Sequence, residues 1–141
     1  MGVFSRLKDL FSKKSIDSLK EVEQELNKLQ KKSNSEIIAL LGIHGRLKGL
    51  PLIYISKNET DLRRISAQLT ELLKPLKNIY SQREIQDIII RYMDSILYYR
   101  PLMKNVSFFA IVPHKNNLIA LQQWINSKRE ILEELFHSSN Q

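Results

Sequence analysis

The sequence predicts an α+β fold in which a five-stranded antiparallel sheet lies between helices on both of its faces. Three observations support this three-layer α/β/α sandwich. Helical and strand-like periods follow one another in the order α-β-β-α-β-β-β-α. Neighbouring strands are joined by connections too short for anything but antiparallel pairing. The strands show little alternation of apolar and polar residues, which is typical of strands covered on both faces. A chain of 141 residues, 43% of them apolar, is long enough for one such domain.

A short amphipathic helix is predicted ahead of this domain. Residues 2–12 place apolar side chains at helical spacing, and residues 13–15 then interrupt the pattern as a hinge would. We therefore expect an N-terminal helical unit at 1–14 and a single domain at 15–141. The helix suits an anionic membrane surface, a partner's groove or a flap over the protein's own core, and the sequence leaves these three open. Its apolar residues are Val3, Phe4, Leu7, Leu10 and Phe11.

Three longer helices follow from their apolar stripes. Residues 16–32 carry one narrow stripe of Leu and Val among Lys, Glu and Gln, which predicts a helix with one thin buried side. Asn58 is a favourable N-cap for a central helix. Pro75 is expected to kink or end that helix near Leu73, because proline cannot donate the helical hydrogen bond. The pattern over 118–136 predicts a closing helix with a wide apolar face.

Five apolar runs complete the predicted sheet. Residues 37–43 and 50–55 are continuous apolar runs joined by the loop HGRLKG, which predicts a hairpin. Residues 84–92, 95–100 and 106–112 are rich in Ile, Tyr, Phe and Val, and they predict a three-strand meander. The meander lies between the central helix and the closing helix.

Composition and motifs argue against several kinds of chemistry. The chain has no cysteine, which excludes disulfides, thiolate metal sites and cysteine nucleophiles. Its three histidines lack partners at metal-ligand spacing, and the sequence has no phosphate-binding glycine motif or nucleophile elbow. We therefore expect a non-catalytic protein without cofactor or metal. No apolar run is long enough to span a bilayer and no signal peptide is evident, which favours a cytoplasmic protein, peripheral on a membrane if the first helix inserts.

The basic balance of the chain does not by itself indicate nucleic-acid binding. The net charge of +7 is spread along the sequence and gives weak attraction to anionic surfaces. Tyr92, Tyr98 and Tyr99 lie near arginines, as in sheets that stack single-stranded bases. Tyr98 and Tyr99 point to opposite faces of one strand, however, and helices are expected on both faces. No specific nucleic acid is expected as a partner.

The chain resembles the roadblock (dynein light chain) family in its order of elements. IIALLGI and LPLIYIS resemble the first two strands, and ETDLRRISAQLTELLKPL resembles the helix between the two groups of strands. IQDIIIRYM, SILYYR and VSFFAIVP look like the meander, and NNLIALQQWINSKREIL looks like the closing helix. The resemblance covers about 16–137. The related longin and profilin-like folds share parts of this layout and are the alternative.

The resemblance implies a non-catalytic scaffold. Roadblock domains pair through the strand after the central helix and through the central helices, and many serve small Ras-like GTPases or act as adaptors. This chain would then form a homodimer or a heterodimer with a related roadblock or longin subunit, with a membrane adaptor as the alternative. The implied dimer interface comprises Gln86, Ile88, Ile90 and Tyr92 on the strand and Arg64, Ala67, Gln68 and Glu71 on the helix. The implied partner-binding residues are Thr60, Arg64, Glu71 and Lys74.

Overall fold

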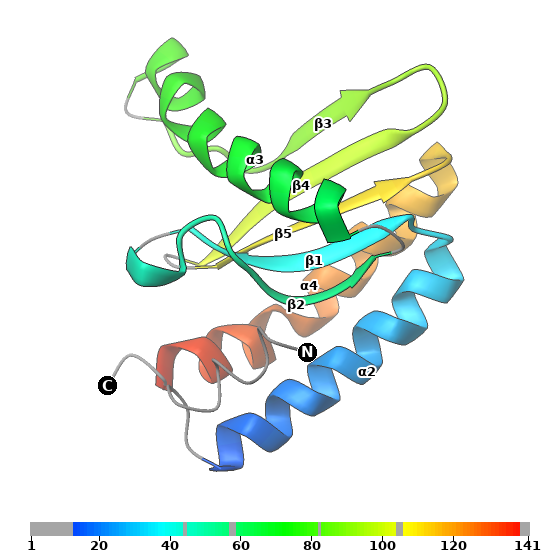
Figure 1. Cartoon of the computed structure of the whole chain (residues 1–141), viewed down its shortest axis with the longest axis vertical. Coiled ribbons are helices and arrows are strands. Elements are labelled where there is room, and N and C mark those ends of the chain that lie inside the picture. The colour runs from blue at the N-terminus through cyan, green and yellow to red at the C-terminus, as the bar shows by residue number, and fades with distance from the viewer. Residues whose placement is uncertain (1–12, 44, 57–58, 82, 104–105, 139–141) are drawn as a thin grey trace.

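A computed structural model describes residues 13–43, 45–56, 59–81, 83–103 and 106–138 (Figure 1). Its five strands form one antiparallel sheet in the order β2-β1-β5-β4-β3. Helix α3 covers one face of the sheet, and α2 and α4 lie together on the other (Figure 1). The predicted α/β/α sandwich is thus confirmed. The elements are α2 (Lys13–Ser33), β1 (Ile37–Gly42), the 3-10 turn η1 (Gly45–Leu47), β2 (Pro51–Ser56), α3 (Glu59–Ile79), β3 (Ile88–Arg91), β4 (Ile96–Met103), β5 (Val106–Val112) and α4 (Lys115–Ser138).

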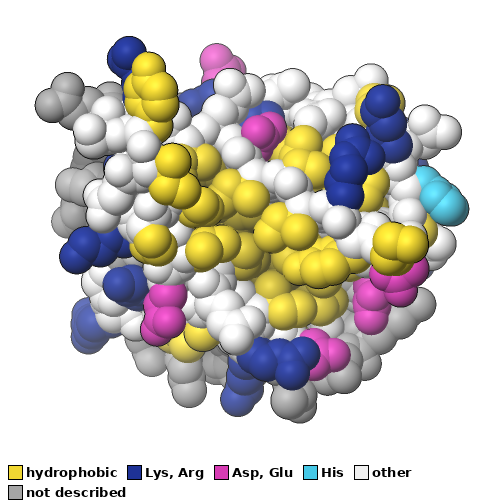
Figure 2. Space-filling model, turned by 90° about the horizontal axis from the view of Figure 1, so that it is seen from above, with side chains coloured by type: hydrophobic (Ala, Val, Ile, Leu, Met, Phe, Trp, Pro, Cys, Tyr) yellow, Lys and Arg dark blue, Asp and Glu magenta, His cyan; other side chains and the backbone are white. Residues whose placement is uncertain are grey.

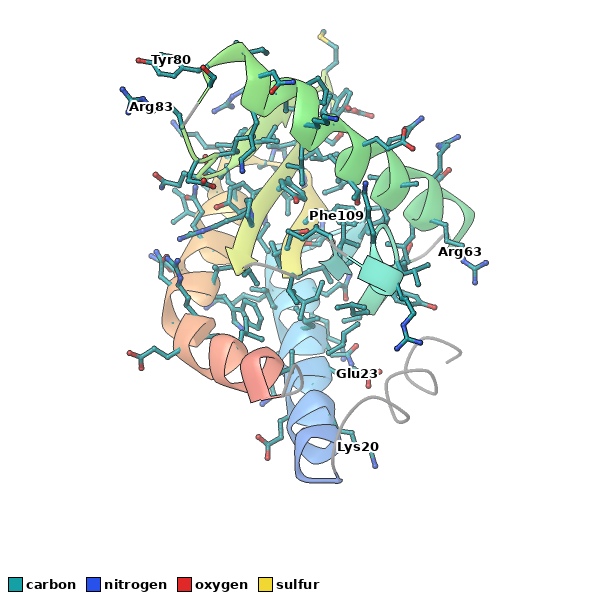
Figure 3. The ribbon with its side chains drawn as sticks, turned by 90° about the vertical axis from the view of Figure 1, so that its left-hand side faces the viewer. Lys20, Glu23, Arg63, Tyr80, Arg83 and Phe109 are labelled. Carbon is teal, nitrogen blue, oxygen red and sulfur yellow. The ribbon has the colours of Figure 1, made fainter. Side chains whose placement is uncertain are left out.

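The sheet divides the interior into two apolar cores. On β5, Phe108 points into the core shared with α2 and α4, and Phe109 points to the face covered by α3 (Figure 3). Both rings are fully buried. Leu26 of α2 and Leu121 of α4 meet on the first face, and Leu62 of α3 lies on the second. Because consecutive strand residues point to opposite faces, an internal strand needs apolar side chains at every position.

Helix α2 begins earlier than the sequence suggested and ends in a well-defined cap. Residues 13–15, expected to be a hinge, are helical. At the other end Asn34 adopts a φ of 53°, and the Ser35 amide donates to the Gln30 carbonyl at 3.1 Å. This left-handed residue with a hydrogen bond back across the last turn is a Schellman-type cap. The Ser33 hydroxyl donates to the Leu29 carbonyl at 2.7 Å, which uses another terminal carbonyl.

The sequence predicted a kink or an end of the central helix near Leu73. The end is wrong, because α3 continues through Pro75 to Ile79. Pro75 removes one hydrogen bond to the carbonyl of Glu71. Both residues are exposed, so water can reach the carbonyl that loses its partner. Leu73 packs against the α3-side core on the opposite side of the helix. This packing stabilises the helix next to the proline.

The predicted limits of two meander strands also change. β3 is shorter than the predicted 84–92, because residues 83–87 have no ladder partner. β4 is longer than the predicted 95–100 and runs through Pro101 to Met103, with a bulge where it pairs with β5. Pro101 is tolerated because β3 has already ended on that side of β4, so no neighbouring strand needs its amide hydrogen.

Several sequence predictions concern residues outside the described ranges. The amphipathic helix at 2–12, with Val3, Phe4, Leu7, Leu10 and Phe11, lies outside them, and so does the N-cap Asn58. Within the described part of the chain, no helix combines the length and apolar composition that crossing a bilayer requires.

Candidate functional site

The outer edge of the sheet at β3 is the first feature that points to function. β3 pairs with β4 on one side, and the sheet ends there on the other. Ile88 and Ile90 are half-buried and belong to the core beneath α3. Ile89 points to the opposite face and remains 41% exposed. The expectation that this strand is covered on both faces is therefore wrong for Ile89 in the isolated chain.

The hydrogen-bond phase of β3 follows from the turn that ends it. The Tyr92 amide donates to the Ser95 carbonyl at 2.8 Å, so these two residues face each other as a hydrogen-bonded pair. Such pairs alternate along an antiparallel ladder, and the register from β3 to β4 is regular. The other even-numbered residues of β3 therefore also bond to β4. The odd-numbered residues, Ile89 and Arg91, direct their backbone N–H and C=O groups toward the open edge.

Exposed apolar side chains surround this edge. Figure 2 shows them gathered on the face of the molecule that carries α3 and β3. Met93 is fully exposed and Tyr92 is 55% exposed at the end of β3, and Leu72 is exposed on α3. We call this region the α3–β3 surface. Its members are Leu72, Leu73, Ile88, Ile90, Tyr92 and Met93.

Further apolar and aromatic groups lie at the C-terminal end of α3. Ile79 is 78% exposed, and the ring of Tyr80 is held 5.1 Å from the guanidinium carbon of Arg83 in a cation–π contact (Figure 3). Exposed apolar groups in such number are more typical of an interaction surface than of a monomer's solvated face. Leu72, Ile79 and Met93 were not among the interface residues that the resemblance implied.

The helix residues implied by the roadblock resemblance follow helical spacing and share the outer side of α3. Ala67 and Lys74 lie toward the η1 turn: a Cβ on Gly49 would come 3.8 Å from the Ala67 Cα, and Lys74 lines a pocket with Lys48. Arg64 forms an ion pair with Asp61 at 2.7 Å. Gln68 and Glu71 are also exposed, Gln86 is exposed before β3, and Thr60 lies in the first turn of α3. Their roles as interface residues stay predictions.

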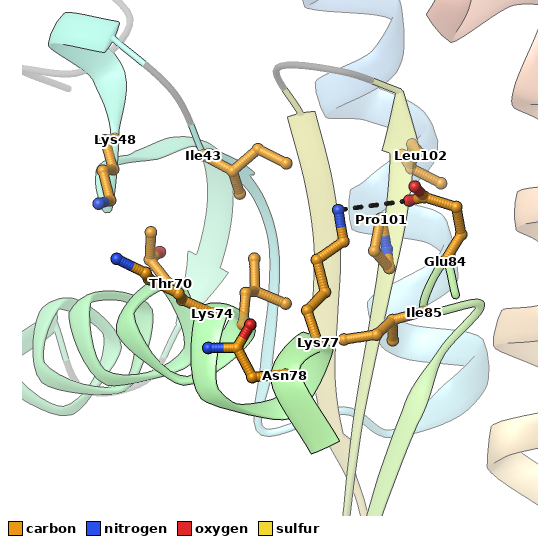
Figure 4. A pocket seen from close by; sticks show the side chains of 11 residues that line it. Ile43, Lys48, Thr70, Lys74, Lys77, Asn78, Glu84, Ile85, Pro101 and Leu102 are labelled. Carbon is orange, nitrogen blue, oxygen red and sulfur yellow. Dashed lines mark ion pairs between the residues drawn. The ribbon is translucent and has the colours of Figure 1, made fainter. Parts of the chain in front are cut away.

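A pocket of about 550 Å³ lies between α3 and the nearby end of the sheet (Figure 4). Its floor includes Leu73 and Leu102, and its rim carries lysines. One of these, Lys77, reaches Glu84 with a Nζ–Oε2 distance of 3.5 Å. Both groups are largely exposed, so this ion pair is weak. The lining residues offer apolar surface and three lysines, with Glu84 as their one carboxylate.

Two buried tyrosines of β4 bear on the nucleic-acid question. Tyr98 and Tyr99 have no exposed surface, so neither ring is available to stack a base. Burial is the main cause that raises the pKa of both hydroxyls. The Tyr98 hydroxyl donates to Asp87 Oδ2 at 3.4 Å, which places the Asp87 carboxylate on the α2–α4 side of the edge. Among the described residues, no group of three or more His, Asp or Glu side chains is placed to hold a metal ion.

The chain has the fold of a roadblock domain: the sheet order matches, one helix covers one face, a helix pair covers the other, and the β3 edge is open. Similar solved structures are the gliding protein MglB from Thermus thermophilus (TM-score 0.69, 11% identity, 89% of this chain and 93% of that chain), an MglB with a tetrameric arrangement (0.64, 10%, 89% and 94%) and a roadblock/LC7 domain from Streptomyces avermitilis (0.55, 9%, 70% and 85%). No family model and no curated protein matches the sequence. The structural similarity confirms the predicted roadblock fold.

Proposed function

We propose that this protein is a non-catalytic scaffold that dimerises through β3 and α3 and binds a small Ras-like GTPase or a related roadblock or longin subunit. The observation that carries the proposal is the open β3 edge beside the apolar α3–β3 surface. An edge strand with apolar side chains is an aggregation hazard unless something covers it. A second subunit covers it without leaving a new open edge.

The size of β3 explains why α3 must take part. A stable interface buries roughly 800 Å² on each partner. Four strand residues supply too little area on their own, and the exposed Leu72 and Met93 supply more. The MglB structure with a tetrameric arrangement supports self-association of proteins with this fold. The GTPase partner rests on the roadblock resemblance, which also fits a cytoplasmic location.

Light scattering coupled to gel filtration tests the dimer. We expect a mass of twice 16.5 kDa for the wild-type chain at micromolar concentration. A clean monomer at high concentration would contradict the proposal. The partner is tested separately with purified Ras-like GTPases loaded with GDP or a non-hydrolysable GTP analogue, measured by biolayer interferometry. A dimer that binds neither loaded form would leave the scaffold without its proposed GTPase partner.

A further inference from the structure

We propose that the partner at β3 is a second copy of this chain, paired antiparallel in one register with Ile89 on the two-fold axis. The inference rests on the proposed dimer and adds its register and the identity of the second subunit. It follows from the symmetry of an edge pairing, from the hydrogen-bond phase of β3 and from two charges beside Ile89.

Symmetry first limits the possible registers. When two identical strands pair edge to edge, the two-fold axis stands perpendicular to the sheet, and each side chain stays on its own face. Each residue is therefore paired with a residue whose side chain lies on the same face of the sheet, and one residue must be paired with its own copy. For a strand as short as β3, the residue on the axis is Ile88, Ile89 or Ile90.

The hydrogen-bond phase favours Ile89. Odd-numbered residues of β3 point their backbone groups toward the open edge. Hydrogen-bonded pairs between the two β3 strands, a contact that we call the seam, must therefore join odd-numbered residues. With Ile89 on the axis, Ile89 faces its own copy, and Asp87 and Arg91 face each other in two equivalent pairs. Asp87 directly precedes β3, and only this register pairs residues 87, 89 and 91 entirely among themselves. With Ile90 on the axis, Ile89 pairs with Arg91, but Asp87 faces the partner's Met93, which lies in the turn. With Ile88 on the axis, Asp87 pairs with Ile89, but Arg91 faces the partner's Ile85, further outside the strand.

The charges select the same register. Asp87, Ile89 and Arg91 share the α2–α4 side of the edge. With Ile89 on the axis, each Asp87 carboxylate lies opposite the partner's Arg91, and opposite charges at facing positions stabilise a sheet. With Ile90 on the axis the two Arg91 side chains become diagonal neighbours, and with Ile88 the two Asp87 side chains do. Both alternatives bring like charges together.

These two charged groups are available for pairing across the seam. Arg91 is exposed and forms no ion pair with any other residue that the structure describes. Asp87 accepts a hydrogen bond at 3.4 Å from Tyr98, which holds the carboxylate beside Ile89 and leaves its second oxygen for another donor. Because one strand carries both charges at equal distance from Ile89, the edge is complementary to itself. That self-complementarity favours a second copy over a different subunit.

The opposite face of the seam is consistent with this register. Ile88 then faces the partner's Ile90, and both side chains already belong to the core beneath α3. The pairing extends that core across the axis and joins the two α3–β3 surfaces. An apolar strip therefore lies on one side of the seam, and two charge pairs flank Ile89 on the other.

Cysteine cross-linking tests the register directly, because the natural chain has no cysteine. Facing residues of a hydrogen-bonded pair have Cα atoms about 5.5 Å apart, within the range of a disulfide. The variants are Ile89→Cys, Ile88→Cys and Ile90→Cys, with Ile119→Cys as the control. Ile119 lies on α4 and is 45% exposed, close to the 41% of Ile89. Each is oxidised with copper phenanthroline and resolved by non-reducing electrophoresis, and its mass is measured by light scattering under reducing conditions.

We expect Ile89→Cys to form a cross-linked dimer at least about ten-fold faster than Ile119→Cys, as an ordered pair does relative to random collision. Ile88→Cys and Ile90→Cys alone should match the control, and the variant carrying both should cross-link. Faster cross-linking by Ile88→Cys or Ile90→Cys alone would overturn the register and leave the edge dimer standing. A reduced dimer in which no variant exceeds the control would overturn edge pairing itself. A monomer in every case would overturn the proposed dimer.

A charge exchange tests the complementarity independently. Asp87→Arg or Arg91→Asp alone should weaken dimerisation by about ten-fold, since each places like charges in both symmetric pairs. The double variant Asp87→Arg/Arg91→Asp should recover most of the wild-type affinity. Circular dichroism confirms that each variant is folded. Additive weakening in the double variant, without recovery, would contradict the proposed pairing.

Discussion

Ile89 offers the sharpest perturbation of the proposed dimer, because it contributes little to the core of the isolated chain. Its side chain is 41% exposed in the monomer and would be covered at the seam. Full burial of an isoleucine is worth about 1.5–3 kcal/mol. The exposed part therefore contributes about 1 kcal/mol per copy, or about 2 kcal/mol in a symmetric dimer. Ile89→Lys removes this contribution and places two ammonium groups close together, which adds about 1 kcal/mol.

The sum of about 3 kcal/mol corresponds to a rise of about 100-fold in the dimer Kd. Sedimentation equilibrium over a concentration series measures that constant, and thermal unfolding checks the fold of the variant. Ile119→Lys is the matched control, because Ile119 is 45% exposed and lies on α4, outside the α3–β3 surface. If Ile89→Lys dissociates the dimer no more than Ile119→Lys does, the edge-pairing reasoning is refuted.

Three further predictions concern the core, the pH dependence and the N-terminus. Leu121→Ala, at a fully buried position of α4, should destabilise the chain by about 2–5 kcal/mol in urea unfolding, and a change below about 1 kcal/mol would contradict the packing. Burial raises the pKa of Tyr98, so its contribution to stability is complete below about pH 10 and is lost as the pH rises through the folded pKa. Tyr98→Phe should therefore lose less stability than wild type between about pH 7 and 11, and equal losses would contradict this. Phe4→Glu/Phe11→Glu should reduce flotation with anionic liposomes if residues 2–12 form an anchor, and unchanged flotation would remove that alternative.

Much of the fold could be predicted because its central strands leave little choice. An uninterrupted apolar run such as that of β1 requires cover on both faces, and the structure provides it. The ends of elements were less predictable. Residues 84–87 look like strand, but the segment of β4 that they would face contains Pro101, which has no amide hydrogen to donate. Pro75 looks like a helix terminus, but its lost hydrogen bond falls on an exposed side while Leu73 stays packed. A local sequence pattern shows neither which residues a strand will face nor which side of a helix will be exposed.

The candidate surface was predicted in outline and missed in detail. The order of elements indicated that β3 would pair with a partner, but the apolar pattern gave no sign that Ile89 would remain exposed. Leu72 falls at core-like helical spacing. In the folded chain it is nevertheless exposed, beside Leu73, which packs against the core. The direction of the backbone groups of β3 depends on the pairing of Tyr92 with Ser95. That pairing depends on how the turn folds, so the sequence pattern alone did not predict it.

In the proposed dimer, the residues that increase affinity differ from those that determine which partner binds. Backbone hydrogen bonds at a four-residue edge are available to almost any strand, so they cannot by themselves choose a partner. The apolar side chains of the α3–β3 surface increase affinity but tolerate a shift of register, since isoleucines follow one another along β3. Asp87 and Arg91 match only when two identical edges meet with Ile89 at the centre. The β3 edge is short and has a charge on each side of Ile89. It therefore selects a second copy of the chain, whereas an apolar edge without these charges would aggregate.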